Sequence, residues 1–184
     1  GRRGRELPRA QHLCDQGVVV RQLREIPLAY PVGAALADVR RFPGSKRYPH
    51  FGSDALAERM PAEGIRYLWL PALGGRRSPR RDSRNTGWKN AAFRAYADYI
   101  VTGEFAEGLR ALTDAAAGAR LAFMCAEAVW WRCHRRIIAD VLTARGWEVR
   151  HIIDASPPAL HRLDPPGHLV DGELSYEPIG SLGI

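Results

Sequence analysis

The sequence contains few cysteines, few lysines and no long hydrophobic run. Its three cysteines are an odd number and do not follow the pattern of a secreted disulfide framework, so we expect reduced thiols. No stretch approaches the ~20 consecutive apolar residues that a membrane helix requires, and the N-terminal residues lack the apolar core of a signal peptide. We therefore expect a cytoplasmic protein without a membrane partner.

Arginine, in contrast, is abundant. Only two of the 27 basic residues are lysines, so 25 are arginines, and the chain carries a formal net charge of +7 with an isoelectric point of about 9.8. This excess favours an anionic partner, because the guanidinium group binds phosphates and carboxylates through two parallel hydrogen bonds. A phosphate-bearing small molecule and nucleic acid both fit this composition.

Hydrophobic periodicity predicts a single α/β domain. The 184 residues suffice for one domain of ordinary size, and 46% hydrophobic with 26% charged residues is typical of a globular chain rather than a disordered one. Short apolar runs predict buried strands, whereas apolar residues that recur every three to four positions predict helices. The expected strands cover residues 34–39, 65–70, 121–124 and 147–153, and the expected helices cover residues 53–60, 90–100, 104–117 and 134–145. We expect a mostly parallel sheet of about four to five strands with helices on both faces, a Rossmann-like architecture.

The two ends of the chain carry weaker signals than its centre. Residues 1–33 are an atypical N-terminal segment, in which residues 18–20 can form a short strand. Residues 169–176 predict a hairpin that turns at Asp171-Gly172. We divide the chain into this N-terminal segment, an α/β domain at residues 34–177 and a tail at residues 178–184.

Two cysteines flank the loop of the central strand–helix–strand unit, residues 121–153. Cys133 is expected in the first turn of the helix, where the helix dipole and neighbouring arginines favour a thiolate, so it is the candidate nucleophile. Its alternative role is packing, because free cysteine is among the most buried residue types. Cys125 ends a buried strand, which favours packing for it and leaves ligand contact as the other role.

Three further residues are candidates for proton transfer. His134 and Glu127 lie in the same loop, and Asp38 follows another strand. A carboxylate at such a position can orient the histidine, act as a general base or hold a ribose hydroxyl. The alternative for either carboxylate is a salt bridge to Arg40 or Arg135.

An anion site is expected at the same edge of the sheet. Gly74, Gly75 and Arg76 follow a strand, and two glycines let backbone N–H groups approach an anion that an arginine can clamp. A pair of glycines also occurs in ordinary turns. Because the carboxyl ends of parallel strands meet at one edge, we expect these residues to line a ligand site together with Arg40, Arg135 and Cys125.

Spacing argues against two familiar cysteine chemistries. A Cys-loop phosphatase or a rhodanese-like enzyme needs an arginine at the position where this chain has Trp131, and Arg132 comes one place too late. Cys125, Cys133 and His134 can be metal ligands, but seven residues separate the thiols and no fourth ligand follows, unlike common zinc motifs. We therefore assign no metal ligand or cofactor and keep a metal-binding protein as an alternative.

Five segments follow one another in order along the chain: residues 37–43 (ADVRRFP), 73–77 (LGGRR), 85–88 (NTGW), 125–127 (CAE) and 133–135 (CHR). Together they resemble the DUF488 family, a bacterial and archaeal group of uncharacterised domains. The resemblance covers residues 34–177 and implies a fold rather than a reaction. Family members usually begin with a strand and a turn that contains glycine, histidine or serine, which residues 1–33 do not show.

We therefore expect a protein that binds a nucleotide or another phosphate-bearing ligand at the carboxyl ends of the strands. The expected enzyme class is a hydrolase or transferase in which His134 and Glu127 transfer protons. One alternative is a non-catalytic nucleic-acid-binding module that uses the arginine-rich loops at residues 40–47 and 76–89. The other is the metal-binding protein described above.

Overall fold

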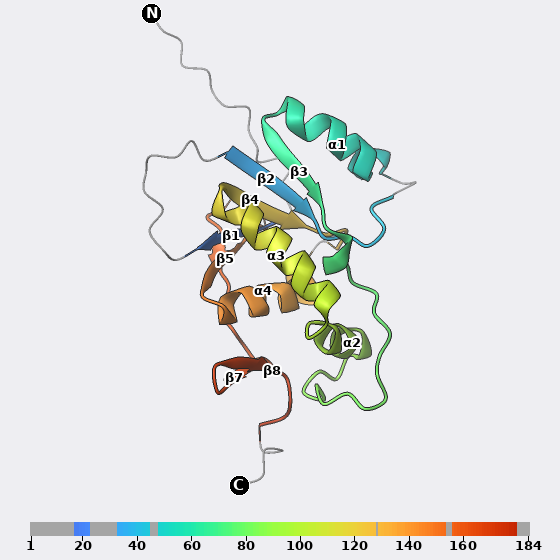
Figure 1. Cartoon of the computed structure of the whole chain (residues 1–184), viewed down its shortest axis with the longest axis vertical. Coiled ribbons are helices and arrows are strands. Elements are labelled where there is room, and N and C mark those ends of the chain that lie inside the picture. Colours follow the sequence, from blue (N-terminus) through green and yellow to red (C-terminus); the bar gives the residue numbers. More distant parts are fainter. Residues whose placement is uncertain (1–16, 23–32, 45–47, 128, 154–155, 180–184) are drawn as a thin grey trace, which may run out of the picture.

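A six-stranded mixed sheet forms the centre of the protein (Figure 1). The computed structural model describes residues 17–22, 33–44, 48–127, 129–153 and 156–179. The strands are β1 (Gly17–Gln22), β2 (Gly33–Asp38), β3 (Ile65–Trp69), β4 (Ala119–Met124), β5 (Trp147–His151) and β6 (Ala159–Leu160). Their order across the sheet is β3-β2-β4-β1-β5-β6.

The parallel part of the sheet consists of β3, β2 and β4. β2 lies between the other two strands, so that Ala37 pairs with Leu68 on one side and with Phe123 on the other. Residues 35–39 are buried, as expected for a strand that is covered on both faces. The carboxyl ends of the three strands consequently lie at one edge of the sheet.

β1 makes the sheet mixed, so the predicted Rossmann-like, mostly parallel sheet is found only in part. This strand contains the apolar residues 18–20 and runs antiparallel to β4 on one side and to β5 on the other. β6 is antiparallel to β5. The apolar run indicated a short strand, but it carries no signal for the direction of the strand or for its partners, which come from distant parts of the chain.

Helix α1 covers one face of the sheet. It spans Ser53–Ala62 and packs Leu56 and Met60 against Leu36 of β2. Successive side chains of a strand point to opposite faces, so the neighbours of Leu36 belong to the core on the other side.

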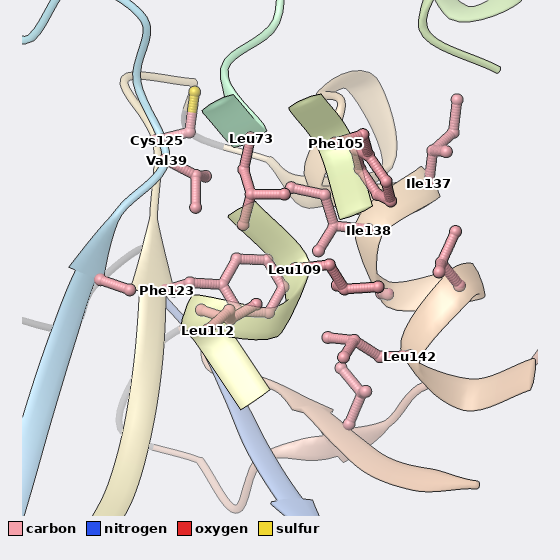
Figure 2. Packing of buried hydrophobic residues seen from close by; sticks show 14 of the residues in the cluster. Val39, Leu73, Phe105, Leu109, Leu112, Phe123, Cys125, Ile137, Ile138 and Leu142 are labelled. Carbon is pink, nitrogen blue, oxygen red and sulfur yellow. The ribbon is translucent and has the colours of Figure 1, made fainter. Parts of the chain in front are cut away.

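The other face carries the larger core and the three remaining helices, α2 (Ala91–Tyr99), α3 (Gly103–Ala117) and α4 (Arg135–Ala144). Figure 2 shows Phe123 of β4 beside Leu109 and Leu112 of α3, with Ile138 and Leu142 of α4 across from them. Helices thus lie on both faces of the sheet, as predicted.

The strand–helix–strand unit expected at residues 121–153 consists of β4, α4 and β5. The two strands run in the same direction, because both are antiparallel to β1, which lies between them. Gly146 follows α4 with a φ of 81°, a left-handed conformation that glycine adopts at little cost, and the chain turns there into β5.

A separate hairpin lies beside α4 (Figure 1). It consists of β7 (His168–Val170) and β8 (Glu173–Ser175), and Asp171 and Gly172 form the predicted turn with positive φ angles. None of the helices in the described part of the chain has the length and apolar character needed to cross a lipid bilayer. Parts of three predicted segments lie outside the described residues: residues 1–16 and 23–32 of the N-terminal segment, residues 45–47 of the first arginine-rich loop, and residues 180–184 of the tail.

Candidate functional site

A pocket of about 360 Å³ lies at the carboxyl ends of the parallel strands. Its walls come from the segments that follow β2, β3 and β4, from α2, and from the turn before α4. The lining residues are Arg40, Arg41, Phe42, Gly44, Gly75, Arg76, Ala92, Phe93, Tyr96, Cys125, Ala126, Glu127, Arg132, Cys133 and His134. Most of the residues expected at this edge are thus brought together, whereas Asp38, Gly74 and Arg135 lie next to the lining but outside it.

The inner end of the pocket holds Cys125, Cys133 and His134, which we call the thiol–imidazole cluster. Nδ1 of His134 lies 3.5 Å from Sγ of Cys133 and 4.0 Å from Sγ of Cys125. The other ring nitrogen, Nε2, lies 3.1 Å from the carbonyl oxygen of Val39 and donates to it, because a carbonyl can only accept. In the neutral ring this contact leaves the lone pair on Nδ1, facing the two sulfur atoms.

The two thiols of the cluster differ in acidity. A hydrogen bond from the Cys125 thiol lowers the pKa of Cys133 to about 6, and the same hydrogen bond, together with burial, raises the pKa of Cys125 to about 12. Burial also opposes the ionisation of Cys133, whereas the charge and the backbone N–H of Arg135 favour it. Cys133 is therefore the thiol that ionises first, which is the property of a nucleophile and of a metal ligand.

Cys133 acquires this environment from its position between two helical elements. The 3-10 helix η4 (Trp130–Arg132) ends at Cys133, whose N–H donates to the carbonyl of Trp130 at 3.1 Å. Helix α4 begins two residues later. The thiol thus receives the backbone N–H of Arg135 at the start of α4, although Cys133 itself precedes the helix and does not lie in its first turn, where it had been predicted.

Arg40 and Asp38 form a buried ion pair beside the pocket. Nε of Arg40 lies 2.7 Å from the carboxylate of Asp38, Nη2 contacts the second carboxylate oxygen, and Nη2 also donates to the carbonyl of Phe51 at 2.8 Å. The carboxylate accepts two further hydrogen bonds, from the hydroxyl of Tyr67 at 2.7 Å and from the N–H of Arg40. The geometry supports a positioning role for Asp38, which holds Arg40 in the pocket wall.

Three exposed arginines surround the mouth of the pocket: Arg41, Arg76 and Arg132, which we call the pocket arginines. Within the described residues none of them forms an ion pair, in contrast to Arg40. Arg76 has a φ of 60°, a left-handed conformation that is uncommon for residues other than glycine, and Arg41 donates to its carbonyl at 3.3 Å. Among the lining residues that the structure describes, Glu127 is the one acidic residue, and it is exposed.

Arg135 supports the site from within the protein. Its side chain is only 1% exposed, and Nη2 donates to the carbonyl of Glu127 at 2.5 Å. This contact ties the loop after β4 to the start of α4, the two segments that carry the cysteines. Arg135 is therefore buried outside the pocket lining, next to the two segments that carry the cysteines.

The two glycines of the predicted anion turn are required by close packing. A Cβ atom at Gly74 would lie 2.7 Å from Cβ and 2.8 Å from Cα of Arg41. A Cβ atom at Gly75 would lie 2.9 Å from Nδ1 of His134, so this glycine keeps open the space beside the thiol–imidazole cluster.

Three of the five arginines of the second arginine-rich loop form contacts within the protein. Arg77 lies over the ring of Tyr99, 3.5 Å from its centroid, and donates to the carbonyls of Gly74 and Ala72. Arg80 pairs with Asp82, and Arg84 pairs with Glu177. These contacts leave fewer cations of this loop available for a partner than the sequence suggests.

A second group of polar residues, not identified from the sequence, lies behind η4. Nε2 of His151 lies 2.9 Å from Nδ1 of His161, Nε2 of His161 lies 2.8 Å from Asp140, and the hydroxyl of Tyr176 donates to the other oxygen of Asp140 at 2.8 Å. All four side chains are buried, and we call them the histidine network. Trp130 of η4 stacks on His151 with 3.6 Å between the ring centroids.

The histidine network and the aromatic wall of the pocket had different signals in the sequence. Asp140 lies among the apolar residues of α4, and an acidic residue on a buried helix face indicates a polar partner inside the protein. The partners of Asp140 come from turn-rich segments with no periodicity, so they could not be identified. Phe93 and Tyr96 belong to the apolar pattern of the helix predicted at residues 90–100, and such a pattern does not distinguish core from pocket.

Fold and site together define an α/β protein with a thiol–imidazole cluster at the inner end of an arginine-lined pocket. The chain belongs to the DUF488 family, whose model is described as a domain of unknown function and matches residues 23–142. Searches of the curated proteins and of the solved structures gave no match. The family match includes every lining residue of the pocket, whereas β1, β5, β6 and the hairpin lie outside it.

Proposed function

We propose that this protein binds a phosphate-bearing small molecule, of about the size of a mononucleotide, in the arginine-lined pocket and acts on it as a hydrolase or transferase. The observation that carries the proposal is the convergence of the three pocket arginines, without carboxylate partners among the described residues, on one cavity. Guanidinium groups bind phosphate through two parallel hydrogen bonds. A volume of about 360 Å³ is at the lower end of the range for small-molecule sites.

The walls of the pocket also fit a ligand with one charged end and one planar end. Phe42, Phe93 and Tyr96 contribute aromatic surface, which can pack against a base or another planar group. The pocket arginines supply positive charge that can bind the phosphate. A nucleotide combines both parts, so it is the first class of ligand to test.

Glu127 is the residue to which we assign proton transfer. Its carboxylate is exposed in the lining, whereas both nitrogens of His134 are directed elsewhere, Nε2 to Val39 and Nδ1 to the sulfur atoms. The proton-transfer role predicted for His134 would have to use Nδ1, next to Cys133. We therefore place Cys133 and His134 at the reacting end of the ligand and Glu127 beside it.

Equilibrium binding of a panel of nucleoside mono- and diphosphates tests the proposal. Arg76→Ala and Arg132→Ala should each weaken binding by about 10- to 100-fold, because a hydrogen bond to a charged group contributes about 1.5 to 3 kcal/mol. Arg110→Ala is the matched control, since it removes an equal charge from an exposed position on α3. Unchanged affinity in both pocket variants, or an equal loss in the control, would contradict the proposal.

The nucleic-acid-binding alternative predicts a different dependence on salt. A protein that neutralises many phosphates loses affinity steeply as salt rises, because bound counterions are released. A small nucleotide in a pocket should show a shallow dependence. Binding of single-stranded DNA that exceeds nucleotide binding and falls steeply with salt would favour the alternative.

A further inference from the structure

Cys125, Cys133 and His134 bring three potential metal ligands into a small volume. Their ligand atoms all lie within 4.8 Å of one another, and the two sulfur-to-nitrogen distances are 3.5 and 4.0 Å. In a tetrahedral zinc site with Zn–S bonds of about 2.3 Å and Zn–N bonds of about 2.0 Å, ligand atoms lie about 3.5 to 3.8 Å apart. The two sulfur-to-nitrogen distances thus lie within about half an ångström of the tetrahedral values, and the sulfur-to-sulfur distance, at most 4.8 Å, needs to shorten by no more than about 1 Å.

The orientation of His134 is the orientation of a metal ligand. A histidine that binds a metal through one nitrogen usually donates its other N–H to a carboxylate or a backbone carbonyl, which fixes the tautomer and the ring. Here Nε2 donates to the carbonyl of Val39, so the lone pair of Nδ1 is directed at the two sulfur atoms. Gly75 leaves the space beside Nδ1 open, because a Cβ atom there would lie only 2.9 Å away.

We propose that Cys125, Cys133 and His134 bind a divalent metal ion of the zinc class, with a fourth coordination position that faces the arginine-lined pocket. Two thiolates and an imidazole select soft or borderline ions such as Zn²⁺ over Mg²⁺ or Ca²⁺. Structural zinc sites are closed by four protein ligands, whereas catalytic sites use three and leave one position for water or substrate. All three ligands belong to the pocket lining, so the open position is accessible from the pocket.

The spacing that argued against a metal in the sequence is explained by the fold. The two thiols come from different elements, the end of β4 and the turn between η4 and α4. The described part of the seven-residue segment between them includes the 3-10 helix η4. Zinc motifs with short spacings place both thiols on one tight turn, and a site assembled from two elements does not follow that rule.

Cobalt titration of the full chain tests the proposal directly. The protein is stripped with a chelator under reducing conditions and titrated with Co²⁺. We expect thiolate-to-cobalt charge-transfer absorption in the near ultraviolet and strong visible bands of tetrahedral Co²⁺, saturating at one ion per chain and abolished by Zn²⁺. Absence of charge-transfer absorption at any Co²⁺ concentration would overturn the proposal.

Variants identify the ligands. Cys125→Ser, Cys133→Ser and His134→Gln should each reduce Co²⁺ affinity by at least about 100-fold, since even residues that only support a ligand contribute about 10- to 100-fold. Cys14→Ser removes the remaining thiol of the chain and should leave the titration unchanged. Full absorption in the cluster variants, or its loss in the Cys14 variant, would place the metal elsewhere and refute the assignment.

A second measurement uses the wild-type protein, so it tests the proposal even if the variants do not fold. In the wild-type protein, Zn²⁺ should protect Cys125 and Cys133 from alkylation while Cys14 reacts as before, resolved by peptide mass spectrometry. Equal labelling with and without Zn²⁺ would overturn the proposal.

The metal proposal and the proposed function are tested by separate experiments, so that one can be refuted without the other. The assignment rests on the cluster alone, so it is tested without any nucleotide. Nucleotide binding is tested in the stripped protein and through arginines that are not metal ligands. A protein that binds Co²⁺ but no nucleotide would support the metal site and contradict the proposed function. A protein that binds a nucleotide but no Co²⁺ would support the proposed function and contradict the metal site.

Discussion

His151 should make the protein sensitive to acid, and His151→Phe should remove that sensitivity. Burial is the first reason that the pKa of His151 falls to about 3 from its usual 6.5, and the charges of His161 and Arg135 act in the same direction. Because the Asp140 carboxylate can only accept, Nε2 of His161 donates to it, and Nδ1 of His161 accepts from Nε2 of His151. A proton on His151 would have to sit on Nδ1, which is buried and has no hydrogen-bond partner among the described residues.

The sign and size of the effect follow from the difference between the folded and unfolded states. Below about pH 6.5 the unfolded chain binds a proton at His151 that the folded protein does not, so the free energy of unfolding falls as pH falls, until about pH 3. The slope is about 1.4 kcal/mol per pH unit, which amounts to about 2 kcal/mol between pH 6.5 and pH 5. The phenylalanine variant keeps a ring against Trp130 but loses the hydrogen bond to His161, at a cost of about 1 to 3 kcal/mol near neutral pH.

Urea denaturation followed by far-ultraviolet circular dichroism measures both effects. We expect the variant to be less stable than the wild type at pH 7 and equal to it near pH 5, because only the wild type loses the His151 contribution. Tyr176→Phe is the control, since it removes a hydrogen bond from the same network without removing a histidine, and its curve should run parallel to that of the wild type. A constant difference between the wild type and His151→Phe from pH 7 to pH 4.5 would refute the reasoning.

Two further substitutions test the packing around the pocket. Asp38→Ala should lower the free energy of unfolding by about 3 to 5 kcal/mol in urea denaturation, because it leaves the buried Arg40 without its partner; a loss below about 1 kcal/mol would show that the pair is not a support of the pocket. Gly74→Ala should cost about 1 to 3 kcal/mol and lower the melting temperature, since its Cβ would meet Arg41 at 2.7 Å, whereas Gly103→Ala, where a Cβ meets no atom within 4 Å, should have little effect.

The parts of the fold that local patterns specify could be predicted from the sequence. The apolar spacing of residues 104–117 predicted α3 almost to the residue, and the strands of the parallel part were found from their apolar runs. The position of β1 could not be predicted in this way. Its central residue Val19 pairs with Ala122 and Arg150, and such distant pairings leave no mark on the apolar run itself.

The candidate site shows the same division between local and distant information. Its location followed from topology, because polar residues after parallel strands must meet at one edge of a sheet. The hydrogen-bond partner of each side chain could not be predicted from the topology. Whether Asp38 faced the pocket or Arg40, and whether His134 faced a ligand or the two sulfur atoms, depends on packing that a single sequence does not encode.

The abundance of arginine has a structural explanation that bears on the partner of the protein. Irregular loops leave backbone carbonyls without the partners that helices and sheets provide, and buried polar groups need a hydrogen bond. Three arginines donate to such carbonyls: Arg40 to Phe51, Arg77 to Gly74 and Ala72, and Arg135 to Glu127. The flat guanidinium with its five donors suits this task better than the ammonium of lysine. These side chains are buried or half-buried, so their charges add to the net charge of +7 without forming an open basic surface. What distinguishes the pocket arginines is that they are exposed and converge on a cavity, and this local arrangement, rather than the total charge, is the reason to favour a small anionic ligand over a nucleic acid.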